Sequence, residues 1–395
     1  MDFTKKYDVV VAGGGIAGVA AALAAARRGK KTVLLEKTVF PGGLATTGLI
    51  YIYLPLCDGN GTQVSFGLTE ELLKASIKYG FGDIPENWEN EKDAAEVKRY
   101  RVRFSPASFI IAMDELLTDA GVDFWLDTVV SKTKVENDTI TAVEVVNKSG
   151  TGLIEGKCFI DCTGDADLVH FSGCNCPIDD NAIALWSIES GKNDLAENIG
   201  MYRHGGSCDP RMGNPGINGK LVSEFVLSGR KTYRERLTED YNIGNSDRHS
   251  RFPLTLPAMA QLRMTRRIDG IFTLEDGMEW TSFEDSVGMG ADWRKSGYVW
   301  EIPYRSLLPK DLKGLLAAGR CMASAGDAWD VMRVIPVAAV TGEAAGVAAS
   351  LSIDENITPD ELDIKLLQQE LRDGCGFPLH FEDVGLCAQN EPEDV

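Results

Sequence analysis

Three glycines near the start of the chain have the spacing of a dinucleotide-binding turn. Gly13, Gly15 and Gly18 follow the pattern Gly-x-Gly-x-x-Gly, and an acidic residue, Glu36, stands eighteen residues after the last of them. The first glycine allows a tight turn, the second lets a pyrophosphate approach the backbone, and the third lets helix and strand pack closely. The carboxylate accepts ribose hydroxyls and disfavours a 2′-phosphate, so the spacing predicts a dinucleotide other than NADP.

The elements that this motif requires surround it. A β-branched run at residues 7–12 precedes the glycines, and an Ala-rich stretch at residues 16–28 follows them and ends in basic residues and Gly29. The apolar run KKTVLLEK then carries Glu36 near its end. Strand, glycine turn, helix and strand form one βαβ unit of a doubly wound α/β sheet. The positive end of the helix dipole would face the phosphates.

Composition limits the class of protein. The 395 residues are 44% hydrophobic and 25% charged, which is typical of a folded globular chain of about two or three domains. The net charge of -19 argues against general binding to nucleic acid or to anionic membranes. The nine cysteines are irregularly spaced and follow no leader segment, so we expect reduced thiols and a cytoplasmic protein. No apolar run is long enough to predict a membrane span.

Three later stretches of sequence distinguish between NAD and FAD as the bound dinucleotide. They are Pro41-Gly42-Gly43, IDCTGDAD at residues 160–167 and LLAAGRC at residues 315–321. With them the chain resembles FAD-dependent oxidoreductases of the glutathione-reductase-like superfamily, which carry two dinucleotide-binding motifs around one extended FAD. Four further strings narrow the resemblance to one family within this superfamily: LRMTRRIDGIFTLEDG, FEDSVGMG, EIPYRSLLP and RVIPVAAVTGEAAGVAA. Over residues 7–351 the chain is similar to the FAD-dependent oxidoreductase family of bacteria and archaea that also includes the flavin module of heterodisulfide reductase.

The resemblance implies which residues hold FAD. Those at the adenosine and pyrophosphate end would be Gly13, Gly15, Ile16, Ala17, Gly18, Glu36, Lys37, Val130, Gly164 and Asp165. Those beside the flavin would be Gly42, Gly43, Leu44, Gly319, Arg320, Arg333, Pro336 and Val337. Pro336 would begin a helix whose positive end faces the flavin and raises its electron affinity. Two alternatives stay open: Val130 as a core valine and Asp165 as a turn residue.

Arg333 is the best single catalytic candidate, because it stands just before that helix and would bind a substrate anion or stabilise reduced flavin. The alternative is an arginine in a structural salt bridge. His204 and His249 are candidate bases for a substrate that loses hydride, although exposed loop histidines are the commoner case. The family often has a histidine after an aspartate such as Asp292, whereas this chain has Trp293.

The cysteines predict no metal site. Cys174-x-Cys176 has a metal-ligand spacing, but no second pair or neighbouring histidine completes a ligand set, and no cysteine run suits an iron–sulfur cluster. The sequence has no second Gly-x-Gly-x-x-Gly motif with its own strand, so we expect no built-in NAD(P)H site. Reoxidation would then use dioxygen, a quinone or an electron-acceptor protein.

Together these patterns predict an α/β protein with a discontinuous Rossmann-like FAD-binding domain (residues 1–50, 106–175 and 302–355). A mixed α+β substrate domain (51–105 and 176–301) is inserted into it, and a C-terminal helix and acidic tail (356–395) follow. The predicted function is hydride transfer between FAD and a small polar substrate, anionic or hydroxylated, since the 176–301 segment is rich in arginine. The alternatives are an electron-transfer subunit of a larger redox complex and a non-catalytic flavin-binding module. The sequence does not indicate the number of chains that assemble.

Overall fold

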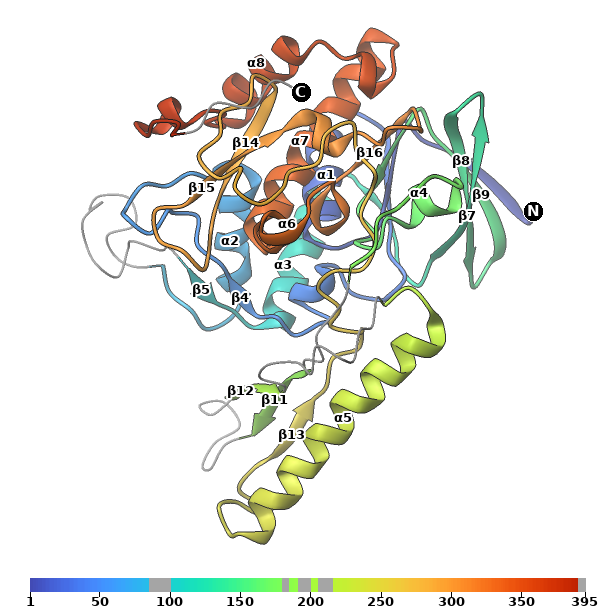
Figure 1. Cartoon of the computed structure of the whole chain (residues 1–395). Coiled ribbons are helices and arrows are strands. Elements are labelled where there is room, and N and C mark those ends of the chain that lie inside the picture. The colour runs from blue at the N-terminus through green and yellow to red at the C-terminus, as the bar shows by residue number, and fades with distance from the viewer. Residues whose placement is uncertain (85–100, 180–184, 191–199, 205–215, 390–395) are drawn as a thin grey trace.

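A computed structural model of the chain describes residues 1–84, 101–179, 185–190, 200–204 and 216–389 (Figure 1). The helices are α1 (Ile16–Arg27), α2 (Leu68–Ile77), α3 (Pro106–Asp119), α4 (Asp167–Phe171), α5 (Gly219–Asn242), α6 (Gly326–Met332), α7 (Ile335–Glu355) and α8 (Ile364–Cys375). The strands are β1 (Phe3–Lys6), β2 (Val9–Ala12), β3 (Thr32–Leu35), β4 (Ile52–Tyr53), β5 (Val102–Arg103), β6 (Asp123–Trp125), β7 (Val129–Glu136), β8 (Thr139–Asn147), β9 (Gly150–Glu155), β10 (Cys158–Asp161), β11 (Leu185–Ser190), β12 (Gly200–His204), β13 (Phe252–Thr255), β14 (Ser286–Ala291), β15 (Val299–Pro303) and β16 (Leu315–Ala317).

A parallel sheet organises the predicted nucleotide-binding part. Its strand order is β16-β10-β2-β3-β6, and every neighbouring pair is parallel. The βαβ unit predicted around the glycines is confirmed as β2, α1 and β3. Because parallel strands end at one edge of a sheet, the residues that follow β2, β3, β10 and β16 meet there.

Two small-residue helices cover this sheet at close range. α1 packs against α7, and glycines of α7 face backbone oxygens of α1: a Cβ on Gly342 would lie 2.2 Å from the oxygen of Ala17. A Cβ on Gly346 would lie 2.4 Å from the oxygen of Ala21. The length and apolar composition of α7 would allow it to cross a membrane, but 89% of its most apolar stretch is buried in the protein. The Ala- and Gly-rich sequence therefore reflects tight helix packing.

A second sheet, β1-β9-β8-β7, lies beside the first (Figure 1). The turn at Asn137-Asp138 joins β7 and β8, and both residues have left-handed backbone angles (φ 50° and 60°) that asparagine and aspartate tolerate. The run FWLDTVVSKTKVEN is interrupted at Asp127 (φ 51°), so that β6 joins the parallel sheet and β7 the second one.

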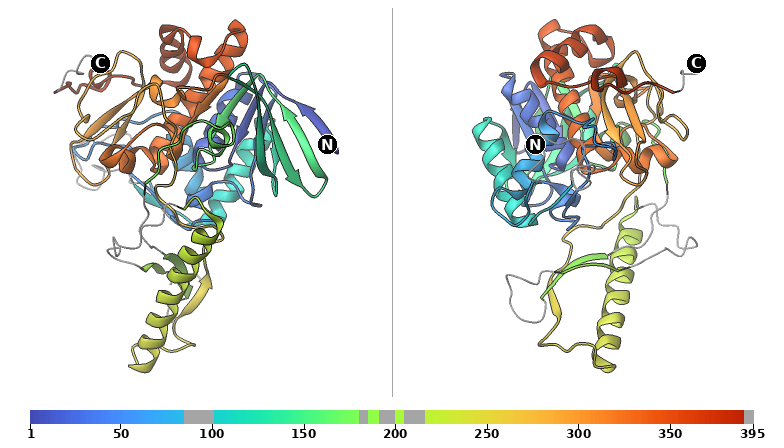
Figure 2. Two further views of the ribbon diagram at one scale, coloured as in Figure 1. Left: turned by 45° about the vertical axis from the view of Figure 1, so that its right-hand side comes forward. Right: turned by 90° about the vertical axis from the view of Figure 1, so that its left-hand side faces the viewer.

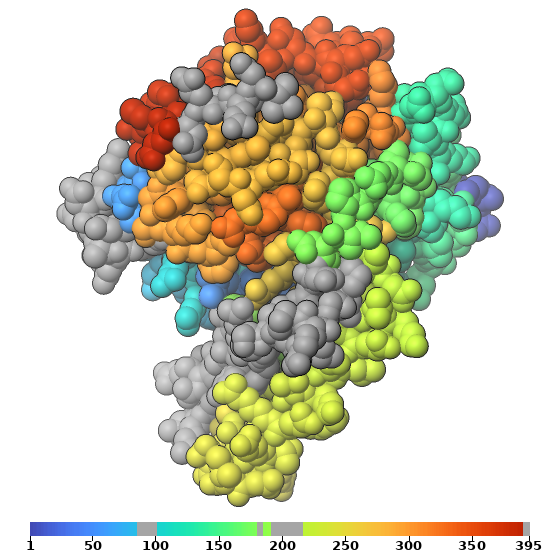
Figure 3. Space-filling view, in the orientation of Figure 1, coloured from blue at the N-terminus to red at the C-terminus, as the bar shows by residue number. Residues whose placement is uncertain are grey.

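One part of the chain projects from the rest. We call it the outlying lobe; it consists of α5 and the sheet β12-β11-β13, within residues 185–255 (Figures 1 and 2). In the space-filling view α5 and the turn after it extend beyond the body of the protein (Figure 3). Of the α5 side chains only Phe225, Gly229 and Tyr233 are buried, a narrow stripe at every fourth residue. Charged residues and Gly229 obscure this stripe in the sequence, which therefore gives no clear helix signal here.

The remaining segments differ in part from the predicted organisation. Residues 320–335 contain α6, and the predicted C-terminal helix is α8, which begins at Ile364. Residues of 51–105, such as Tyr53 and Leu72, share one hydrophobic core with α1, α7 and Trp300 of β15. Of the lobe, Ile188 packs against that core, and the division into domains stays a prediction.

Candidate functional site

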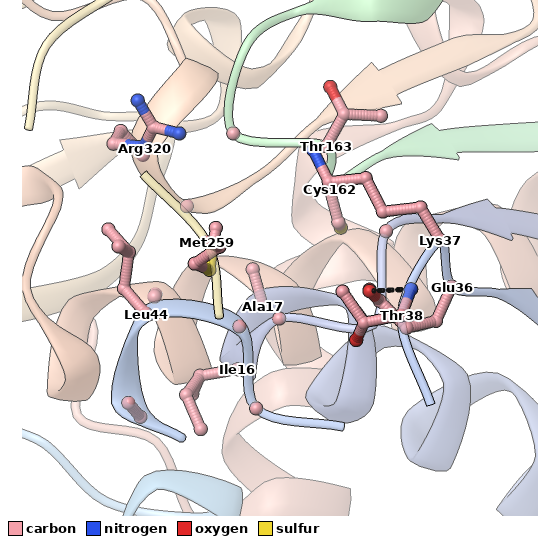
Figure 4. Close-up of a pocket in the computed structure, with 18 of the residues that line it drawn as sticks. Ile16, Ala17, Glu36, Lys37, Thr38, Leu44, Cys162, Thr163, Met259 and Arg320 are labelled. Atoms are coloured by element: carbon pink, nitrogen blue, oxygen red, sulfur yellow. Dashed lines mark hydrogen bonds between the residues drawn. The ribbon is translucent and has the colours of Figure 1, made fainter. Parts of the chain in front are cut away.

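A groove runs along the carboxyl edge of the parallel sheet (Figure 4). The predicted cofactor residues that line it are Gly13, Gly15, Ile16, Ala17, Glu36, Lys37, Gly42, Gly43, Leu44, Val130, Gly164, Gly319, Arg320 and Arg333. These residues come from segments far apart in the sequence, and the sheet topology brings them together. The groove therefore joins the glycine turn to the start of α7.

The glycine turn has three different steric requirements. Gly13 has a left-handed φ of 96°, and a Cβ there would lie 2.4 Å from the Cys162 oxygen. A Cβ on Gly18 would lie 1.8 Å from the Gly13 oxygen, so both positions need glycine for the fold itself. A Cβ on Gly15 would meet no atom within 4 Å, because it would point into open space. The free space at Gly15 is therefore a cradle that a ligand can enter.

The amino terminus of α1 opens onto this cradle. Gly15 is the N-cap residue, no side chain caps the helix, and the first turn contains no acidic residue. The first backbone N–H groups of a helix have no partner within it and attract anions. Ile16 and Ala17, which provide two of them, line the groove. The arrangement suits the pyrophosphate of a dinucleotide.

Glu36 fixes the turn and also faces the groove. Its Oε2 accepts the N–H of Gly14 at 2.7 Å, and its Oε1 accepts the N–H of Thr38 at 2.7 Å (Figure 4). The side chain is buried, yet it lines the groove. Each carboxylate oxygen has lone pairs beyond one hydrogen bond, so Glu36 can also accept ribose hydroxyls.

Charged side chains form the opposite wall. Arg320 lines the groove and donates from Nη2 to Asp165 at 3.0 Å and from Nη1 to Thr265 at 3.0 Å. Burial alone would raise the pKa of Asp165, but the charges of Arg320 and Lys37 outweigh it and lower that pKa below its usual value. Asp165 thus stays ionised and holds Arg320 at the groove.

The Pro41–Leu49 segment forms the wall next to Gly15. The N–H of Gly42 donates to the Gly14 oxygen at 2.7 Å, and Gly42 has a φ of 100°. Gly43, with a φ of 54°, lies so close to Gly15 that a Cβ on it would be 3.1 Å from the Gly15 Cα. The Gly-Gly pair therefore lets two loops approach each other and leaves a flat wall.

Arg333 lies where the groove meets α7. Its Nε and Nη2 donate to Oδ1 of Asp330, at 3.1 and 2.5 Å, and the structure assigns no partner to Nη1 among the described residues. Asp330 also accepts from Arg294 at 3.1 Å. Trp293, which stands where the family often has histidine, donates from Nε1 to the Asp330 backbone oxygen at 3.3 Å. The pair with Asp330 orients Arg333 and leaves Nη1 for a ligand.

Four predicted cofactor residues do not line the groove: Gly18, Asp165, Pro336 and Val337. Gly18 packs against Gly13, and Asp165 accepts a hydrogen bond from Arg320. Gly13 and Arg320 both line the groove. Pro336 and Val337 are buried in the first turn of α7, whereas Ile335 and Ala338 of the same helix face the groove.

The two histidines lie in the outlying lobe. His249 is exposed in the turn after α5, and that turn lies at the end of the lobe away from the body of the protein (Figure 1). His204 ends β12, opposite Leu185 of β11, and its side chain lies outside the described residues. The structure does not bring His249 to the lining of the groove, and the described residues contain no cluster of His, Cys, Asp and Glu that could hold a metal.

Sequence reasoning missed several lining residues, namely Leu35, Thr38, Ala45, Thr128, Val129, Cys162, Thr163, Asp167, Met259, Ala318, Ile335 and Ala338. Most are chain neighbours of predicted ones, so the carboxyl-edge rule could have found them. Met259 is different. It comes from the segment that returns from the lobe, and no motif marks it.

Comparison with known proteins decides the family. The family described as FAD dependent oxidoreductase matches residues 8–189 and 222–371, which is most of the chain. The chain belongs to this family. FAD is its cofactor and its class is oxidoreductase, as the resemblance implied.

Individual relatives agree at the level of the fold. Two thioredoxin reductases match short stretches: that of Ureaplasma parvum is 36% identical over 74 residues (18% of this chain, 24% of the relative). That of Bacillus subtilis is 29% identical over 102 residues (26% of this chain, 30% of the relative). The chain thus spans about a quarter to a third of these curated relatives. A geranylgeranyl bacteriochlorophyll reductase-like protein of Thermoplasma acidophilum has a similar fold, with a TM-score of 0.50 at 15% identity over 94% of this chain and 84% of that one.

Proposed function

We propose that this FAD-dependent oxidoreductase binds FAD along the groove and transfers a hydride between it and a small anionic or hydroxylated substrate. Glu36, Lys37 and Val130 would hold the adenosine end, and Gly15 with the amino terminus of α1 would hold the pyrophosphate. The isoalloxazine would lie between the Gly42–Leu44 wall and the start of α7. FAD supplies the two-electron chemistry, and the protein supplies binding, orientation and charge.

The observation that carries this proposal is the open cradle at Gly15. A glycine turn that served only the fold would pack all three of its glycines against protein atoms, as Gly13 and Gly18 pack against backbone. Gly15 instead has no neighbour within 4 Å of its missing Cβ, beside helix N–H groups that no side chain caps. Backbone that approaches a ligand requires this geometry.

Arg333 is the proposed substrate-facing cation. Its guanidinium is largely buried and held by Asp330, so it is ordered before a ligand arrives, which lowers the entropic cost of binding. The free Nη1 provides two N–H donors for a carboxylate or hydroxyl oxygen. A fixed positive charge there also favours electron density on the flavin ring during reduction.

The likeness to the flavin module of heterodisulfide reductase and the nature of the electron acceptor remain predictions. For the acceptor we propose dioxygen, a quinone or a partner protein. The groove contains one glycine turn of the dinucleotide type, and the described residues form no second one.

Anaerobic mixing of the FAD-loaded protein with alcohols, sugars, amines and carboxylic acids tests the proposal. We expect one class to bleach the flavin band, and we expect Arg333→Met to slow that bleaching at least tenfold while dithionite still reduces the variant. If a donor reduces the wild type and Arg333→Met equally fast, Arg333 does not face the substrate. If no donor bleaches the wild type, the hydride-transfer proposal fails and the electron-transfer role in a larger complex is favoured.

A further inference from the structure

The segment that returns from the outlying lobe forms part of the groove. Its Ala258 donates from the backbone N–H to the Thr47 oxygen at 2.8 Å, and Met259 then enters the groove, where Figure 4 shows it between Leu44 and Arg320. The hydroxyl of Thr47 is 3.0 Å from the Met259 sulfur and 2.8 Å from the Gly43 oxygen. The same segment therefore contacts both the lobe and the Gly42–Leu49 loop.

Gln261 is the residue of this segment that bonds to both sides. Its Nε2 donates to the Gly48 oxygen at 2.5 Å, in the loop, and to the Trp186 oxygen at 3.3 Å, in β11 of the lobe. Its Oε1 accepts the N–H of Trp186 at 2.8 Å. Only 3% of Gln261 is exposed, so water cannot replace these bonds easily.

The loop that accepts the hydrogen bond from Gln261 has a strained residue, Leu49, directly after Gly48. Leu49 has a left-handed φ of 54°, which is costly for a residue other than glycine. Such a conformation persists only where neighbouring contacts impose it. Gly48 donates to the Gly43 oxygen at 3.1 Å, so the bond from Gln261 acts one hydrogen bond away from a residue that lines the groove.

We propose that Gln261 is a positioning residue that couples the outlying lobe to the wall of the groove. A ligand that binds in the groove would then alter β11, and a ligand that binds on β11 would alter the wall of the groove. The inference rests on the proposed function for its ligand, since FAD beside Gly43 and Leu44 is what would press on the loop. The coupling itself is a property of the protein and exists in the apo form.

Hydrogen–deuterium exchange with and without FAD tests the coupling. The variants are Gln261→Glu, which keeps the acceptor for the Trp186 N–H but loses the donor to the Gly48 and Trp186 oxygens, and Gln261→Leu, which loses the acceptor and the donor. The matched control is Gln368→Leu: Gln368 is also buried and donates to two backbone oxygens, of Glu284 and Ser286, away from the groove. Each variant is first checked for a cooperative thermal transition.

In the apo protein we expect both Gln261 variants to exchange at least tenfold faster over residues 43–50, with Gln368→Leu within twofold of wild type there. On adding FAD, residues 185–190 should become protected in wild type and in Gln368→Leu but not in Gln261→Glu. If Gln261→Glu exchanges like wild type over residues 43–50, or if FAD still protects residues 185–190 in it, the coupling is refuted. If wild type binds no FAD, the proposed function fails, and the apo comparison alone decides the role of Gln261.

Discussion

Replacing Gly15 by alanine should weaken FAD binding and leave the fold intact. Gly15 has a φ of -65° and a ψ of 178°, which alanine adopts without strain, and the added methyl group meets no protein atom within 4 Å. At such a position the change restricts the unfolded chain and stabilises a protein by about 0.4–1 kcal/mol. The free energy of unfolding should therefore be unchanged or slightly higher.

The loss in affinity follows from where the methyl group points. It would occupy the cradle in which the pyrophosphate approaches the backbone, and would displace at least one hydrogen bond from an N–H to a charged oxygen. Such bonds contribute roughly 1.5–3 kcal/mol. The dissociation constant of FAD should accordingly rise roughly 10- to 150-fold.

Titration of the apo protein with FAD, followed by flavin fluorescence, measures this change, and thermal unfolding of the same samples measures stability. Gly219→Ala is the matched control, because Gly219 also has open space around its missing Cβ but lies in the lobe. Gly13→Ala is the opposite control and should fail to fold. Unchanged FAD affinity in a folded Gly15→Ala variant would refute the assignment of the cradle.

Three further predictions concern charged groups. Glu36→Ala should raise the FAD dissociation constant at least tenfold and lower the melting temperature, because two backbone N–H groups lose their acceptor; a tight-binding variant would contradict this. Arg333→Met should lower the flavin midpoint potential by about 30 mV, equivalent to about 1.4 kcal/mol, in a spectroelectrochemical titration; an unchanged potential would place Arg333 away from the ring. The hydrogen bond with Glu301 raises the pKa of His380 above 6.5. Its stabilisation is complete below pH 6.5 and is lost as pH rises through the raised pKa, so the difference in melting temperature between wild type and His380→Gln should shrink from pH 5.5 to 9. A constant difference would argue against this titration.

The sequence predicted those parts of the site that depend on local backbone. The Gly13–Gly18 turn, Glu36 and the Gly42-Gly43 pair each have one conformation or neighbour that their residue types favour, and all of these residues except Gly14 and Gly18 line the groove. Gly164 and Arg320, which the family resemblance implied, follow β10 and β16, and the carboxyl ends of these parallel strands meet at the groove.

The contacts that depend on the lobe could not be predicted in this way. α5 has a stripe of only three buried residues, and its charges outweigh that pattern. Met259 and Gln261 have no motif, since Met259 reaches the groove and Gln261 reaches Gly48 only because the chain returns there from the lobe. The histidines were selected by chemical type without knowledge of position, and His249 lies at the exposed end of the lobe.

The measurement that tests the central claim most directly is the visible absorption spectrum of the purified protein, before and after the addition of FAD. We predict flavin bands in the purified protein, or their perturbation when the apo protein takes up FAD at one equivalent. A folded, colourless protein that takes up no FAD would contradict the assignment of the groove as an FAD site.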